Sequence, residues 1–122
     1  MLLSAFGTDS AVNWAKMALL GSVNVYPLKG EIDLHVSPGV ESSLGSIIAK
    51  RPEHVVVDFS GVTFIDSSGL AVLIKAMQDV KEYGGKLTLA RINDNVRSIF
   101  EIARLDQVFL IDPRDDELLA AD

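Results

Sequence analysis

The stretch of sequence that decides the fold runs from residue 55 to residue 70 and reads Val55-Val56-Val57-Asp58-Phe59-Ser60-Gly61-Val62-Thr63-Phe64-Ile65-Asp66-Ser67-Ser68-Gly69-Leu70. It begins with three β-branched residues in a row, which is typical of a strand buried on both faces of a mixed or parallel sheet. Helical periodicity begins at Leu70. We therefore expect a junction from strand to helix between residues 58 and 70, with two serines at the start of the helix.

Strands and helices are predicted to alternate downstream of this junction. A helix has one apolar face and ends at a pair of glycines, and an alternating strand follows it. Either Asn93 or Asp94 can cap a third helix, which is followed by a short strand and a terminal helical piece. The residues that carry these predictions are Leu70, Leu73, Ile74, Met77 and Val80, then Gly84-Gly85, Lys86–Ile92, Val96, Ile99, Phe100 and Ala103, Val108–Ile111 and Glu117–Ala120.

The segment upstream predicts an N-terminal hairpin and a first helix. Val12–Leu20 and Val23–Leu28 are expected to be its two strands, with Pro27 at an edge or a bulge because it cannot donate to a sheet. A separate alternating segment, 31–35, should place Ile32 and Leu34 on one face. Ser37 and Pro38 then predict a helix that begins with a serine N-cap and ends near Arg51.

This alternation predicts an α/β fold with right-handed crossovers. We expect a single domain over residues 11–122, preceded by an extension at 1–10. Its mixed sheet should have four to five strands, including the N-terminal hairpin, with helices packed mainly on one face.

Composition narrows the classes of function. The chain has 122 residues, 48% of them hydrophobic, and a net charge of −6, and its basic residues form no stripe, so nucleic acid is an unfavourable partner. Without cysteine, and with His35 and His54 as its two histidines, the chain offers neither a disulfide framework nor a histidine-rich metal site, and we expect no cofactor. Neither a secretory signal nor a membrane span is predicted, so we expect a soluble, cytoplasmic protein.

Enzymatic uses of the junction fit poorly. A hydrolase nucleophile at Ser67 would need glycine at position 65, which is Ile65, and no histidine follows it in the chain. A phosphate-binding loop would need a lysine after its glycine. An aspartyl-phosphate site at Asp58 would need an acidic pair and a lysine on other strands. The simplest alternative is that the acid and serines at 66–68 only cap the helix.

At these residues the sequence resembles the anti-sigma factor antagonist family, whose members are small proteins of the sulfate transporter and anti-sigma antagonist (STAS) domain class. The resemblance is carried by residues 55–60 and by Asp66-Ser67-Ser68-Gly69-Leu70, and is supported by the segment Gly30-Glu31-Ile32-Asp33 upstream. It covers roughly residue 11 to the end of the chain.

The resemblance implies a binding module, not an enzyme, that is switched by phosphorylation of Ser67. The kinase would be the anti-sigma factor itself, a phosphatase of the PP2C type would reverse the modification, and the unphosphorylated form would bind the anti-sigma factor and free a sigma factor. The implied supporting residues are Asp58, Asp66, Ser68 and Gly69, and the implied partner surface contains Ile32, Asp33 and His35. The alternative is a STAS scaffold subunit of a signalling or lipid-transport complex, in which the serine only caps.

Overall fold

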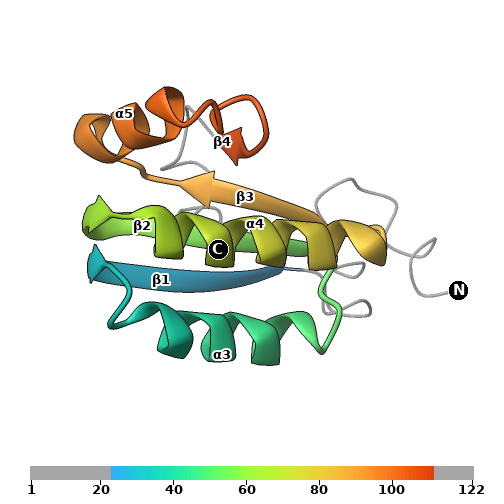
Figure 1. The fold of residues 1–122 in the computed structure, drawn as a ribbon. Coiled ribbons are helices and arrows are strands. Elements are labelled where there is room, and N and C mark those ends of the chain that lie inside the picture. Colours follow the sequence, from blue (N-terminus) through green and yellow to red (C-terminus); the bar gives the residue numbers. More distant parts are fainter. Residues whose placement is uncertain (1–22, 112–122) are drawn as a thin grey trace, which may run out of the picture.

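The structure is a computed structural model, and it describes residues 23–111. Strands and helices alternate along this part of the chain (Figure 1). The elements are β1 (Val23–Ile32), α3 (Ser37–Ile48), β2 (His54–Ile65), α4 (Ser67–Glu82), β3 (Lys86–Ala90), α5 (Asp94–Ile102) and β4 (Leu110–Ile111). The strand expected at 12–20 and the helical piece expected at 117–120 lie outside the described residues.

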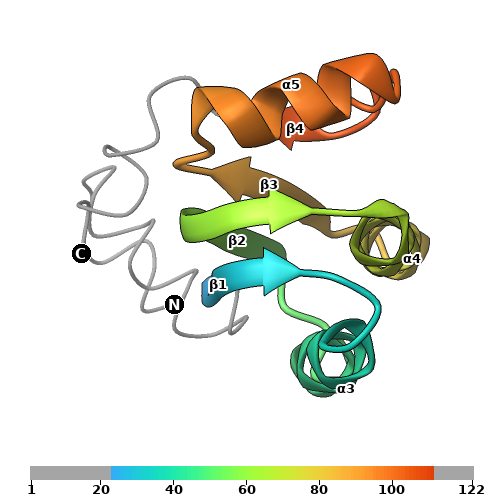
Figure 2. The same ribbon diagram turned by 60° about the vertical axis from the view of Figure 1, so that its left-hand side comes forward.

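The four described strands form one sheet in the order β1-β2-β3-β4, and every neighbouring pair is parallel. Helices α3 and α4 lie side by side along the sheet, and α5 lies beside β3 and β4 (Figure 2). The α/β class, the single domain and the four strands were predicted correctly. The antiparallel pairing of the expected hairpin involves residues 12–20, which lie outside the described residues.

Strand β2 is an inner strand of the sheet, paired on both sides, as the β-branched run predicts. Val55, Val57 and Phe59 have no exposed surface and belong to the core beneath the helices. Phe59 packs edge to face on Phe100 of α5, with the ring centroids 5.9 Å apart. Aromatic rings bury large apolar areas, so this contact fixes α5 against the sheet.

Two predicted boundaries in this region are wrong. The predicted strands Val23–Leu28 and 31–35 are one strand, β1, whose register shifts between Pro27 and Lys29 and again between Gly30 and Glu31. The chain continues through these bulges because Gly30 adopts a φ of +77°, which glycine accepts without steric cost. Strand β2 likewise continues to Ile65 instead of turning after Asp58.

Helix termini follow the sequence more closely. Asn93 caps α5, since its side chain accepts a hydrogen bond from the backbone N–H of Val96 at 2.9 Å. Gly84 has a φ of +87° just after α4, as expected of a glycine that ends a helix. Residues 23–111 contain no helix that is both long and apolar enough to cross a membrane.

Candidate functional site

The junction between β2 and α4 consists of one residue, Asp66, which lies in extended conformation between the strand and the helix. Its Oδ1 atom accepts hydrogen bonds from the backbone N–H groups of Ser68 at 2.9 Å and Gly69 at 3.2 Å. The Ser68 hydroxyl donates to the same oxygen at 2.6 Å. This hydroxyl, together with the backbone donors, lowers the pKa of Asp66, so the carboxylate is ionised at neutral pH.

Ser67 is the first residue of α4 and is exposed. Its hydroxyl has no hydrogen-bond partner among residues 23–111, because the helix is capped by Asp66. A capping role for Ser67, one of the roles that the sequence allowed, is therefore wrong. A serine hydroxyl in this position is accessible to another protein.

Ser68 is in a different environment, although it is the next residue. It is half-buried, and its oxygen lies 3.1 Å from the hydroxyl oxygen of Ser37 at the start of α3. Ser37 in turn donates to the backbone carbonyl of Asp33 at 2.7 Å. The predicted cap at Ser37 is wrong, since Val36 is the N-cap and Ser37 is a buried residue of the first turn.

The turn between β1 and α3 lies next to Asp66. The Asp66 N–H donates to the carbonyl of Ile32 at 3.1 Å, and the N–H of Leu34 is close enough to the Asp66 carboxylate to contribute to its lowered pKa. Asp33 stabilises the turn, since its carboxylate accepts from the N–H groups of His35 at 3.0 Å and Val36 at 3.2 Å. The structure thus brings Asp33 and His35 to the same end of the sheet as Ser67.

Ile32 does not belong to this surface. Its side chain is 2% exposed and packs in the core, which overturns its place among the predicted partner contacts. The most exposed large apolar side chains beside the site are Leu34 and Phe64, at 73% and 45% exposure, and Val36 in the same turn is 38% exposed. Sequence reasoning singled out neither Leu34 nor Phe64. It missed Leu34 because alternation placed this residue with Ile32, whereas β1 ends at Ile32 and the turn points Leu34 outward.

Gly69 has a packing role that the sequence did not show. A Cβ atom at this buried position would lie 2.7 Å from Cγ1 of Ile65 and 2.8 Å from the carbonyl oxygen of Ile32. No real Cβ atom tolerates such contacts without a shift of its neighbours. The glycine therefore lets α4 start directly against β1, and this close packing explains why a glycine is needed here.

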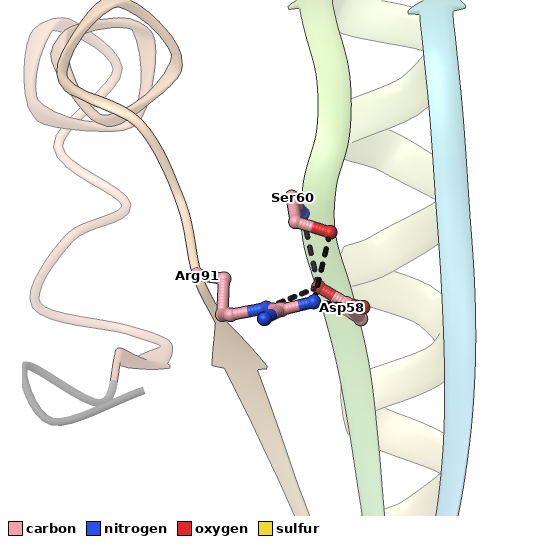
Figure 3. A network of polar contacts seen from close by, with 3 residues as sticks. All are labelled: Asp58, Ser60 and Arg91. Atoms are coloured by element: carbon pink, nitrogen blue, oxygen red, sulfur yellow. Dashed lines mark hydrogen bonds and ion pairs between the residues drawn. The ribbon is translucent and has the colours of Figure 1, made fainter. Parts of the chain in front are cut away.

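Asp58, the remaining predicted residue, belongs to another cluster (Figure 3). It lies within β2 and accepts from the Ser60 N–H at 2.9 Å and from the Arg91 guanidinium at 3.4 Å. Burial raises the pKa of Asp58, but these donors outweigh it and the net pKa is lowered. Within residues 23–111 no hydrogen bond joins Asp58 to Asp66, Ser67 or Ser68.

The described residues do not form a metal centre. Nowhere between residues 23 and 111 do three or more His, Asp or Glu side chains come together in a way that could hold a metal ion. His35 is exposed at the turn. The Nε2 atom of His54 lies 2.7 Å from the Thr88 hydroxyl, and His54 begins β2, whereas Ser67 follows the opposite end of that strand. What the site offers is one accessible hydroxyl between an ionised aspartate and exposed apolar side chains.

Comparison with known proteins assigns the chain to a family. The model of the STAS domain matches residues 16–118, so the chain belongs to the STAS domain family. It is 29% identical over 90 residues to the anti-sigma F factor antagonist of Paenibacillus polymyxa, covering 73% of this chain and 77% of that protein.

Solved structures agree with this assignment. An anti-sigma factor antagonist from Mycobacterium paratuberculosis is 31% identical and superposes with a TM-score of 0.68, covering 82% of this chain and 85% of that one. The Bacillus cell fate determinant SpoIIAA in its phosphorylated form has the same fold, with a TM-score of 0.62 at 19% identity over 83% of this chain and 92% of that one.

Proposed function

We propose that this protein is an anti-sigma factor antagonist whose binding is switched by phosphorylation of Ser67. The observation that carries the proposal is the exposed Ser67 hydroxyl, which makes no hydrogen bond within the described residues and lies in the surface that would contact the partner. The family assignment and the names of the relatives support the same function.

The partner surface that we propose consists of Leu34, His35, Phe64 and Ser67, with Asp33 holding the turn in place. Interfaces gain most of their affinity from a few apolar or aromatic anchors that become fully buried. Leu34 and Phe64 are suited to this task because they are large and exposed in the free protein. They replace Ile32 as the apolar contacts.

The switch follows from local charge. A phosphoryl group adds about −1.5 to −2 charge at pH 7. The N–H groups of Ser68 and Gly69 already bind the Asp66 carboxylate, so they are not available to the phosphate. Asp66 is ionised and Asp33 lies in the neighbouring turn. The added charge therefore repels these carboxylates and makes the docking surface too negative for a partner that bound the neutral serine.

The proposed partners are an anti-sigma factor that is also a serine kinase, and a PP2C-type phosphatase that removes the phosphate. The SpoIIAA structure described above is of a phosphorylated protein, which supports the idea that this fold accepts the modification. Ser67 would be a substrate of its partner and would catalyse nothing itself. Because sigma factors act in transcription, we place the protein in the cytoplasm.

The experiment that tests this function measures binding to the anti-sigma factor encoded nearest to this gene. We expect the wild-type chain to bind, and Ser67→Asp to weaken the affinity at least about tenfold through charge repulsion. Ser46→Asp is the matched control, because Ser46 is an exposed serine on α3, outside the proposed surface. Equal affinities of wild type and Ser67→Asp would contradict the switch and favour a STAS scaffold.

A further inference from the structure

Two adjacent serines begin α4, and the structure treats them differently. Ser67 is exposed and makes no hydrogen bond within the described part of the chain. Ser68 is half-buried, donates to Asp66 at 2.6 Å and lies 3.1 Å from the hydroxyl of Ser37. Ser37 is 4% exposed and comes from a helix 31 residues earlier in the chain.

Counting protons shows how the Ser68 hydroxyl is held. Ser37 and Ser68 carry one hydroxyl proton each but make three contacts, to the Asp66 carboxylate, to the Asp33 carbonyl and to each other. A carboxylate is the strongest of these acceptors, so the Ser68 proton stays on the short bond to Asp66. The Ser37 proton is then directed mainly to the Asp33 carbonyl, at 2.7 Å, and is shared with the Ser68 oxygen, at 3.1 Å. The Ser68 hydroxyl thus donates to Asp66 and contacts the Ser37 hydroxyl at the same time.

We propose that Ser37 and Asp66 determine which serine is modified: they hold the hydroxyl of Ser68 in this chain of hydrogen bonds, so that a kinase transfers phosphate to Ser67 alone. The inference rests on the proposed function, because it concerns the modification of the same site. Ser37 acts as a positioning residue, since it reaches the reacting groups only through Ser68.

The chemistry of phosphoryl transfer explains why the hydrogen bonds matter. The serine oxygen forms a bond to the γ-phosphorus of ATP, the bond from that phosphorus to the departing ADP breaks, and the serine proton passes to a base of the kinase. Ser67 can direct its lone pair and its proton as the kinase requires. Ser68 would first have to leave Asp66 and turn away from Ser37.

The test uses the cognate kinase and ATP with three variants, Ser67→Ala, Ser67→Ala/Ser37→Ala and Ser67→Ala/Ser46→Ala. Mass spectrometry follows phosphate at Ser68. We expect almost none in the single variant, a rise of about tenfold when Ser37 is also replaced, in line with the loss of one hydrogen bond, and no rise with the Ser46 control. Ready phosphorylation of Ser68 in Ser67→Ala would overturn the proposal and indicate that Asp66 activates this hydroxyl instead.

A second measurement needs no kinase and separates this inference from the proposed function. We expect the Ser68 hydroxyl proton to exchange slowly with water in the NMR spectrum of the otherwise unmodified protein, and to exchange at least about tenfold faster in Ser37→Ala but not in Ser46→Ala. Fast exchange in the wild type would overturn the proposal even if Ser67 is phosphorylated. If no kinase modifies the chain, the proposed function fails while slow exchange still supports the hydrogen-bonded hold on Ser68.

Discussion

The four-residue pattern Asp-x-Ser-Gly occurs twice in the chain, at residues 58–61 and 66–69, and the two copies have opposite roles. In each, the aspartate accepts a hydrogen bond at 2.9 Å from the N–H of the serine two residues later. The second residue of the first copy is Phe59, which has no exposed surface. The second residue of the other copy is Ser67, which is exposed.

Charge separates the two copies as well. The Asp58 carboxylate is paired with Arg91 (Figure 3). Asp66 has no basic partner within residues 23–111. The same contact from aspartate to backbone thus lies beside a core residue of strand β2 in one copy, and beside an exposed hydroxyl at the start of α4 in the other. The local pattern sets the aspartate contact, and the surrounding structure decides whether the segment is part of the core or a candidate site.

The largest expected difference in stability between the two copies comes from replacing the second residue of each pattern. Phe59→Ala should lower the free energy of unfolding by about 3–5 kcal/mol, because it leaves a cavity beside Phe100. Ser67→Ala should change it by less than about 0.5 kcal/mol, as is usual for an exposed side chain without partners. Denaturant titration of both variants measures the difference, and similar losses in the two would show that Ser67 has a structural role.

Replacing the glycine that ends each copy, Gly61 or Gly69, should give a smaller difference in the free energy of unfolding. Gly69→Ala forces a Cβ against Ile65 and the Ile32 carbonyl, and we expect it to cost about 1–3 kcal/mol of unfolding free energy even though alanine favours helices. At Gly61 a new Cβ would lie 3.2 Å from Cγ of Lys29 and 3.3 Å from the carbonyl oxygen of Leu28, and because both contacts are longer than those at Gly69, Gly61→Ala should cost less. Thermal unfolding of the pair tests this order, which an equal loss would contradict.

The smallest expected effect concerns the two carboxylates. Both pKa values are lowered in the folded protein from an ordinary value of 3.8, so each group contributes stability that is present at higher pH and is lost as the pH falls through the folded pKa. The Asp58 contribution includes a partly exposed ion pair with Arg91, which salt screens, and the Asp66 contribution does not.

Unfolding curves of Asp58→Asn and Asp66→Asn below about pH 4 measure these contributions, since each variant should flatten the acid loss of stability. High salt should reduce the effect of Asp58→Asn more than that of Asp66→Asn. A salt response of equal size in both variants would show that Arg91 does not distinguish the two carboxylates.

Much of the fold could be predicted because it depends on residue type and period. Val55-Val56-Val57 marked the central strand, and Asn93 and Gly84 marked helix ends, since each has a local physical preference. The end of β2 could not be predicted, because the polar residues between 58 and 63 resemble a turn and only pairing with β1 keeps them in the strand.

The contacts around the candidate site differ from those that the sequence predicted. Ser67 is exposed, as a modification site requires, but its modification stays a prediction. The cap is Asp66, and Ile32 is buried where Leu34 is exposed. The contact between Ser37 and Ser68 joins residues from two helices, and no local pattern encodes it. Such errors arise where the tertiary structure, and not the local sequence, decides which way a side chain points.

The central claim is that the second copy of the pattern is modified by a partner and the first is not. Tandem mass spectrometry of the wild-type chain, after incubation with ATP and the kinase encoded nearest to its gene, tests this directly. We expect one phosphoryl group, located on Ser67, with Ser60 and Ser68 unmodified. A chain that stays unmodified, or that carries phosphate on Ser60 or Ser68 with Ser67 free, would contradict the claim.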